Sequence, residues 1–141
     1  MKTLILYYSF SGNTRKLASQ KAAETGADIE EIIETKKMFV LKAYILGAYR
    51  AMKRKKTDIQ PIKSQLNDYE KIIIMVPVWA SNPAPAFNSI IEQLPSGKKV
   101  ELIMVSAGSG TKSSAEGTKN LVAARGCEVT DYIDIKTMAK K

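Results

Sequence analysis

Residues 3–14 read TLILYYSFSGNT, a short apolar run followed at once by a polar turn. The run from Thr3 to Tyr8 lacks the polar alternation of a half-exposed strand, which predicts a strand buried on both faces of a parallel sheet. The turn Ser9–Thr14 leads into residues 14–25, where apolar side chains recur at helical spacing and Gly26 supplies a C-terminal cap. This order predicts the first strand–helix unit of an alternating α/β fold.

The alternation of strand and helix continues along the rest of the chain. Further strands are predicted at 28–35, 72–76, 100–105 and 129–135. Further helices are predicted at 38–55, 85–94 and from 111 or 113 to 124. The 28–35 strand is polar, which is typical of a strand at the edge of a sheet. Pro77 is expected to end the strand at 72–76. The sequence contains no repeat and no low-complexity linker, so residues 1–141 are predicted to form a single domain.

Connections of this length require crossovers between the strands. We therefore expect an α/β fold with a five-stranded parallel sheet and helices on both faces. Doubly wound sheets of this kind can have the strand order 2-1-3-4-5.

Composition restricts the chemistry that the chain can carry out. It has no histidine and one cysteine, Cys127, which excludes an internal disulfide, a multi-cysteine metal site and Ser-His or Cys-His catalysis. Cys127 is expected to be a small buried residue before the last strand. We find neither a secretory signal nor a run of about 18 apolar residues, and therefore expect a cytoplasmic protein.

The net charge of +8 is concentrated in one segment of the chain. Residues 36–56 contain eight lysines and arginines and no acid, whereas the rest of the chain has 14 basic and 14 acidic residues. Three interpretations of Lys36–Lys56 stay open: a packed helix with solvated lysines, a docking surface for an acidic protein or an anionic membrane, and a cap that attracts an anionic substrate or a nicotinamide phosphate. No recognition motif supports nucleic-acid binding.

Three polar turns follow the first, third and fourth strands: Ser9–Thr14, Val76–Pro85 and Ser106–Thr111. Ligands of such sheets bind at the carboxyl ends of the strands, where the winding direction reverses. The three turns are neighbours if the strands have the order 2-1-3-4-5. They are called the first, second and third loop below.

The first loop has the composition of an anion site. It holds three hydroxyls, one amide side chain and Gly12, and it leads directly into a helix N-terminus, whose amides and dipole favour a negative charge. Because the Walker lysine is absent, a terminal monophosphate is favoured over a nucleotide triphosphate. The alternative from the residues alone is an ordinary N-cap turn.

The other two loops suit a flat ligand. Trp79, the only tryptophan, is either a stacking platform for a planar ring or part of a small satellite core. The third loop offers backbone amides and carbonyls with little side-chain bulk, which can bond the polar edge of a heterocycle.

The chain resembles the flavodoxin family in these three loops. The matching stretches are YYSFSGNTRKLA at 7–18, PVWASNPAPAF at 77–87 and SAGSGT at 106–111. The resemblance implies a flavodoxin-like three-layer sandwich that binds FMN non-covalently. Its five-stranded parallel sheet would have the strand order 2-1-3-4-5. The resemblance also implies that the first loop holds the phosphate, while the second and third loops flank the isoalloxazine ring.

Carried over position by position, the resemblance names fifteen cofactor-binding residues. The phosphate would be bound by side chains of Ser9, Ser11, Asn13 and Thr14 and by backbone of Phe10 and Gly12. The ring would be flanked by the second-loop residues Pro77, Val78, Trp79 and Ala80, with Trp79 packing against the ring or its edge. Its pyrimidine side would meet Ser106, Ala107, Gly108, Ser109 and Gly110.

Three departures from the family qualify its use of the flavin. Flavodoxins that carry electrons are usually acidic, whereas this chain has the basic segment. The third loop lacks a second aromatic residue, which leaves one flavin face open to a substrate. The second loop has no glycine between Val78 and Pro85, and in the family a glycine peptide there often flips to meet the reduced flavin. This chain is therefore expected to stabilise one-electron-reduced flavin weakly.

We consider three functions. The first is electron transfer through FMN to a redox partner protein. The second is an FMN-dependent reductase that takes hydride from a nicotinamide donor and passes it to a quinone or similar acceptor. The third, of another class, is a non-redox binding module that kept the fold and lost the flavin.

Overall fold

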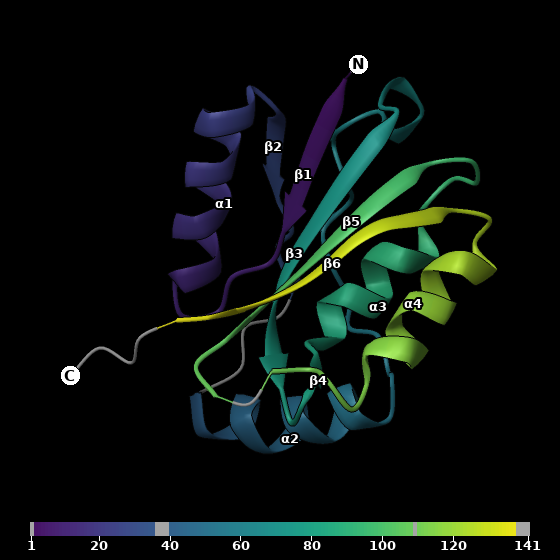
Figure 1. Cartoon of the computed structure of the whole chain (residues 1–141). Coiled ribbons are helices and arrows are strands. Elements are labelled where there is room, and N and C mark those ends of the chain that lie inside the picture. Colours follow the sequence, from purple (N-terminus) through teal and green to yellow (C-terminus); the bar gives the residue numbers. More distant parts are fainter. Residues whose placement is uncertain (1, 36–39, 109, 138–141) are drawn as a thin grey trace.

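Five parallel strands form the centre of the protein, in the spatial order β2-β1-β3-β5-β6 (Figure 1). Their bounds are β1 Thr3–Tyr7, β2 Asp28–Glu31, β3 Lys71–Trp79, β5 Lys99–Ser106 and β6 Glu128–Lys136. A two-residue strand, β4 (Asn82–Pro83), pairs antiparallel with the end of β3. Counted without β4, the order is 2-1-3-4-5, so the predicted fold class is confirmed.

The structure is a computed structural model that describes residues 2–35, 40–108 and 110–137, and for 40–45 the backbone alone. Its helices are α1 Asn13–Thr25, α2 Val40–Met52, α3 Pro85–Glu92 and α4 Ala115–Ala124, with a short 3-10 turn at Leu66–Asp68. None of the helices in the described ranges has both the length and the apolar character of a membrane-spanning helix.

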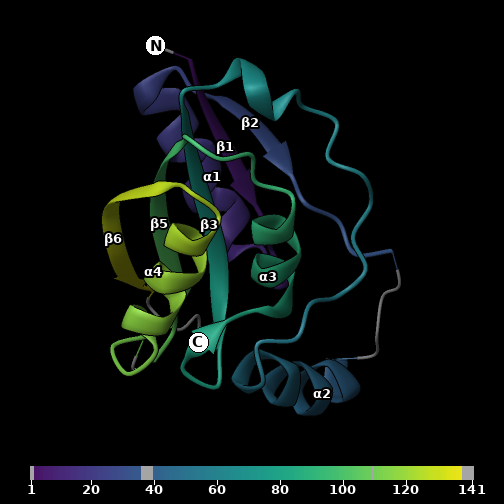
Figure 2. The same cartoon turned by 90° about the vertical axis from the view of Figure 1, so that its right-hand side faces the viewer.

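Two of the three layers are helical, and α2 belongs to neither of them. Helix α1 covers one face of the sheet, and α3 and α4 cover the other (Figure 1). Helix α2 lies instead across the carboxyl ends of the strands, as both views show (Figures 1 and 2). The loops that follow β1, β3 and β5 therefore open towards α2.

The central strands are buried on both faces, as their continuous apolar sequences predict. In β3, Ile72 and Ile74 pack in the core under α3, while Ile73 and Met75 pack in the core under α1. Cys127 is also buried, as expected, and its thiol donates to the Pro95 carbonyl at 3.2 Å.

One charged side chain is buried between α1 and the sheet. Glu101 in β5 is 5% exposed and pairs with Lys21 of α1 at 3.1 Å and Lys71 of β3 at 2.9 Å. Burial alone raises the pKa of this carboxyl, but the two lysines outweigh burial, and the pKa of Glu101 lies below its usual value.

Some element bounds differ from the prediction. Strand β3 does not end before Pro77 but continues to Trp79, because its last two residues pair with β4. Strand β2 ends at Glu31 rather than residue 35, and Glu34 makes only an isolated bridge to Ile59. Helix α4 begins at Ala115, after a turn. Helix α2 covers Val40–Met52 of the predicted 38–55, and residues 38–39 lie outside the described residues.

Candidate functional site

The first and second loops meet at an aromatic cluster. The ring centroids of Phe10 and Trp79 are 5.5 Å apart and those of Tyr8 and Trp79 are 6.2 Å apart, both edge to face. Because β1 and β3 are neighbours in the sheet, their carboxyl ends bring these loops together. Trp79 is therefore part of a local cluster and also lies beside the first loop, as a ring-stacking residue would.

The first loop ends in an uncapped helix N-terminus. Gly12 occupies the N-cap position with φ of 100°, a backbone conformation that favours glycine, and no side chain caps α1. The first backbone bond within the helix runs from the Lys16 amide to the Gly12 carbonyl at 3.1 Å. The N-cap alternative predicted a side-chain cap on α1, and none forms there, so no side chain occupies the end of the helix where an anion would bind.

The hydroxyls of this loop have different surroundings. Ser9 accepts a hydrogen bond from the Gly12 amide at 3.0 Å, which braces the turn and still leaves its own O–H able to donate. Ser11 is exposed, Asn13 is half-buried and Thr14 is 2% exposed. Their role in phosphate binding stays a prediction.

The charges at the start of α1 also suit an anion. Arg15 and Lys16 occupy the first turn, and no acidic residue does. Positive side chains at this end are unfavourable to the helix dipole unless an anion offsets them. Arg15 also forms an ion pair with Glu31 of β2, whose carboxylate oxygen lies 2.5 Å from the guanidinium nitrogen.

The second loop is a two-residue hairpin between β3 and β4. Trp79 pairs with Asn82, which leaves Ala80 and Ser81 as the central turn residues, with φ of 52° and 62°. Positive φ at both positions is the type I′ turn, which usually takes Asn-Gly. The side-chain amide of Asn82 donates to the Ala80 carbonyl at 2.8 Å. Two residues other than glycine are thus held in left-handed conformations at the candidate site.

A network beyond the turn holds it in place. The Ser114 hydroxyl donates to the Ser81 carbonyl at 2.7 Å. The Arg54 guanidinium donates to the Ser114 carbonyl at 3.0 Å and to the Thr118 hydroxyl at 2.7 Å. Burial lowers the pKa of Arg54 from its usual value. The residues that follow α2 are thereby joined to α4 and to the second loop.

Helix α2 approaches the Trp79 ring closely at Gly47. A Cβ atom at Gly47 would lie 2.5 Å from Cζ3 of Trp79, so only glycine allows this approach. The Trp79 ring therefore contacts α2 as well as Phe10 of the first loop. Pro77 and Val78 are half-buried, and Ala80 is exposed at the tip of the hairpin.

The third loop is tied to β6. The Asp134 carboxylate accepts the Thr111 hydroxyl at 2.8 Å and the Thr111 amide at 3.2 Å. Gly110 takes φ of 75°, and a Cβ there would lie 3.2 Å from the same carboxylate. Ser106 is buried, Ala107 and Gly108 are exposed, and Ser109 lies outside the described residues. The described residues of this loop thus lie at the carboxyl end of β5, and their contact with the pyrimidine side of the flavin stays a prediction.

A buried tyrosine supports the aromatic cluster from behind. The Tyr8 hydroxyl bonds the Glu34 carboxylate, which also accepts the Thr57 hydroxyl at 2.9 Å. Burial first, and then the Glu34 hydrogen bond, raise the pKa of the Tyr8 phenol above its ordinary value.

The sequence analysis missed three polar residues that hold the site in shape: Asp134, Ser114 and Glu34. Asp134 had a usable signal, because a carboxylate at the carboxyl end of the last predicted strand lies at the ligand edge of the sheet. Ser114 and Glu34 had none, since their partners are distant in the sequence.

Of the basic segment Lys36–Lys56, Lys36, Lys37 and Phe39 lie outside the described residues. Arg54 belongs to the network described above, and Lys56 pairs with Glu92 of α3 at 2.8 Å. Lys53 and Lys55 are exposed, and the Lys55 amine lies 5.7 Å above the Tyr49 ring.

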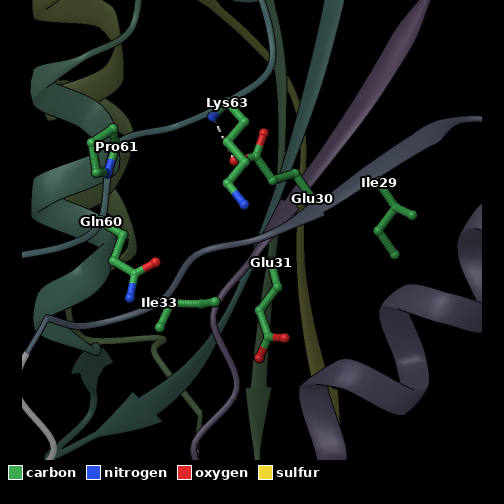
Figure 3. A pocket seen from close by; sticks show the side chains of 7 residues that line it. All are labelled: Ile29, Glu30, Glu31, Ile33, Gln60, Pro61 and Lys63. Atoms are coloured by element: carbon green, nitrogen blue, oxygen red, sulfur yellow. Dashed lines mark hydrogen bonds between the residues drawn. The ribbon is translucent and has the colours of Figure 1, made fainter.

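Two cavities lie away from the three loops. One, of about 290 Å³, lies at the edge of β2, where the Glu30 carboxylate holds the Lys63 amide at 2.7 Å beside Pro61 and Ile33 (Figure 3). The other, of about 230 Å³, lies between Arg54, Asn88 of α3 and Leu121 of α4. The polar groups named here bond one another or the backbone, so neither cavity adds a ligand group to the loops.

Comparisons with known proteins agree with this fold. The sequence profile of the family described as NADPH-dependent FMN reductase matches residues 1–135. A crystal structure of a flavoprotein in complex with FMN from Lactobacillus acidophilus superposes with a TM-score of 0.80 at 26% identity, covering 94% of this chain and 92% of that one. The resemblance to flavodoxin-like proteins is confirmed.

Two further relatives are more distant in sequence. An uncharacterized protein of Archaeoglobus fulgidus is 24% identical over 94% of this chain and 84% of its own length. A solution structure of two-electron reduced Megasphaera elsdenii flavodoxin has a TM-score of 0.56 at 21% identity, covering 96% of this chain and 87% of that one. The latter shows the shared fold.

Proposed function

Because the chain belongs to the NADPH-dependent FMN reductase family, we propose that it is an oxidoreductase whose bound FMN accepts a hydride from NADPH and passes both electrons to a second substrate. FMN as the cofactor is confirmed by the family and by the relative crystallised with FMN. Bound FMN supplies reversible hydride chemistry. Its use as a single-electron carrier, the first of the functions considered from the sequence, stays a prediction.

The residues of the first loop fit the phosphate of FMN. The start of α1 has free space beside Gly12, no side-chain cap and no acid in its first turn, where Lys16 and the Glu31-paired Arg15 are the two cations. Ser11, Asn13 and Thr14 would bind the phosphate together with the amides of the turn, and Ser9 would hold the turn in shape while it donates its own proton. Trp79 and Phe10 would pack against the flavin ring system, and the third loop would bond its polar edge.

The turn at Ala80 and Ser81 supports the proposal of two-electron over one-electron chemistry. A flip of the peptide between them would convert the type I′ turn into type II′, in which the first residue keeps positive φ and takes a conformation that only glycine adopts readily. Ser81 would be relieved by the flip, but Ala80 would be strained. The peptide flip that supports one-electron-reduced flavin in flavodoxins is therefore opposed at Ala80.

Anaerobic mixing of the FMN-loaded protein with NADPH tests this function. We expect the oxidised-flavin absorption to disappear in one step, faster than that of free FMN at the same concentration. A subsequent addition of a quinone should restore the absorption. Bound flavin that NADPH reduces no faster than free FMN would contradict the proposed activity and would leave the carrier function in its place.

A further inference from the structure

Helix α2 forms the outer layer at one end of the molecule, and one of its faces is uncovered (Figures 1 and 2). Gly47 and Ala51 are buried on the side that packs against the protein. On the outward side, Tyr49 is 52% exposed and Met52 is 60% exposed. Because these two are three positions apart, they lie side by side on the helix surface.

Positive charge surrounds this apolar pair. Lys53 follows Met52 directly, and the Lys55 amine lies 5.7 Å above the Tyr49 ring. No acidic residue occurs between positions 36 and 56, and the eight basic residues there equal the net charge of the whole chain. A helix face that only meets solvent would usually carry acidic as well as basic residues. It would also have no reason to expose a tyrosine and a methionine.

The size of this face distinguishes between two kinds of partner. A helix of 13 residues is about 20 Å long and about 10 Å wide, so its outward face offers on the order of 200 Å². A stable protein interface buries about 800 Å² per partner. A single amphipathic helix is sufficient for binding in the plane of a membrane interface, where tyrosine and long lysine chains are favoured.

We propose that the surface made of Tyr49 and Met52 on α2, together with Lys53 and Lys55 just after the helix, docks on an anionic lipid surface. The apolar side chains enter the headgroup region, and the lysines stay at the level of the lipid phosphates. The carboxyl end of the sheet, with its three loops, then faces the membrane. This interaction is independent of the proposed NADPH chemistry, because it uses none of the loop residues.

Sedimentation of the full-length FMN-loaded protein with lipid vesicles tests the proposal. We expect binding to phosphatidylcholine vesicles that contain roughly one-third phosphatidylserine, little binding to pure phosphatidylcholine, and loss of binding at high salt. Each lysine removed from the surface should weaken partitioning about fivefold, so Lys53→Ala with Lys55→Ala should weaken it about 25-fold. Met52→Glu, at an exposed position, should weaken it by at least as much as one lysine.

The matched control is Lys63→Ala with Lys99→Ala, which removes the same charge from exposed positions beside the β2 edge and at the start of β5. Equal binding by the two double variants, or no preference for anionic vesicles, would overturn the proposal. Soluble polyglutamate serves as a second probe. If it binds through Lys53 and Lys55 while the vesicles do not, the partner is an acidic protein, and the lipid assignment is wrong.

Discussion

The substitution Ala80→Gly is expected to change how the protein handles single electrons. Ala80 has φ of 52° in the turn that joins β3 to β4. A flip of the following peptide would leave its φ positive and move it into a region that non-glycine residues occupy at a cost of about 1–3 kcal/mol. Glycine removes that cost. Glycine also removes the smaller cost of the left-handed conformation that Ala80 already has, so the net gain is about 1–2 kcal/mol, and the flipped turn should become about 5- to 30-fold more populated.

Ser81→Gly is the matched control for this change. Ser81 also has positive φ, 62°, and its carbonyl bond from Ser114 does not depend on its side chain. The flip would bring Ser81 to negative φ, which suits any residue, so glycine at this position does not favour the flipped turn. Both variants remove the strain of a non-glycine residue in a left-handed conformation. Only Ala80→Gly also removes the strain that the flipped turn would impose.

The assay is an anaerobic reductive titration of the FMN-loaded proteins, followed by visible absorption. We expect Ala80→Gly to accumulate more one-electron-reduced flavin at half reduction than the wild type, and Ser81→Gly to resemble the wild type. An unchanged fraction in Ala80→Gly would refute the reasoning. So would an equal rise in both variants, because general loosening of the turn would then be the cause.

Three further predictions concern the packing around the site. Gly47→Ala places a Cβ atom 2.5 Å from the Trp79 ring and should destabilise the fold by about 1–3 kcal/mol, seen as a lower Tm; an unchanged Tm would mean that α2 does not pack there. Tyr8→Phe removes the bond to the Glu34 carboxylate and should cost about 1.5–3 kcal/mol in urea unfolding. Glu101→Gln should cost about 1–3 kcal/mol at neutral pH, less than a fully buried pair because its lysine partners reach solvent. Since the folded pKa of Glu101 is depressed, its contribution is present above about pH 4.3 and is lost as pH falls through the folded pKa. A deficit that does not shrink in acid would contradict this assignment.

The central strands of the sheet could be predicted from the sequence because each is a nearly uninterrupted apolar run. Strand β3 is buried on both faces, and helices of ordinary spacing separate the strands, so the parallel order followed from crossover rules. The continuation of β3 through Pro77 could not be predicted, because it depends on a two-residue partner strand.

The site could be predicted where its groups are local in sequence. The first loop and Trp79 are such cases. The position of α2 was not available from its periodicity, because the same amphipathic pattern suits a helix on a sheet face and one across its end. The left-handed conformations of Ala80 and Ser81 were also hidden, since neither residue signals a type I′ turn.

The central claim, that the uncapped start of α1 holds the FMN phosphate, is tested most directly by comparing FMN and riboflavin binding. In the wild type we expect FMN to bind far more tightly than riboflavin. In the double variant Ser11→Ala with Thr14→Ala, two bonds to a charged group are lost, so FMN should bind at least about a hundredfold more weakly while riboflavin changes little. Equal losses for the two ligands would contradict the claim.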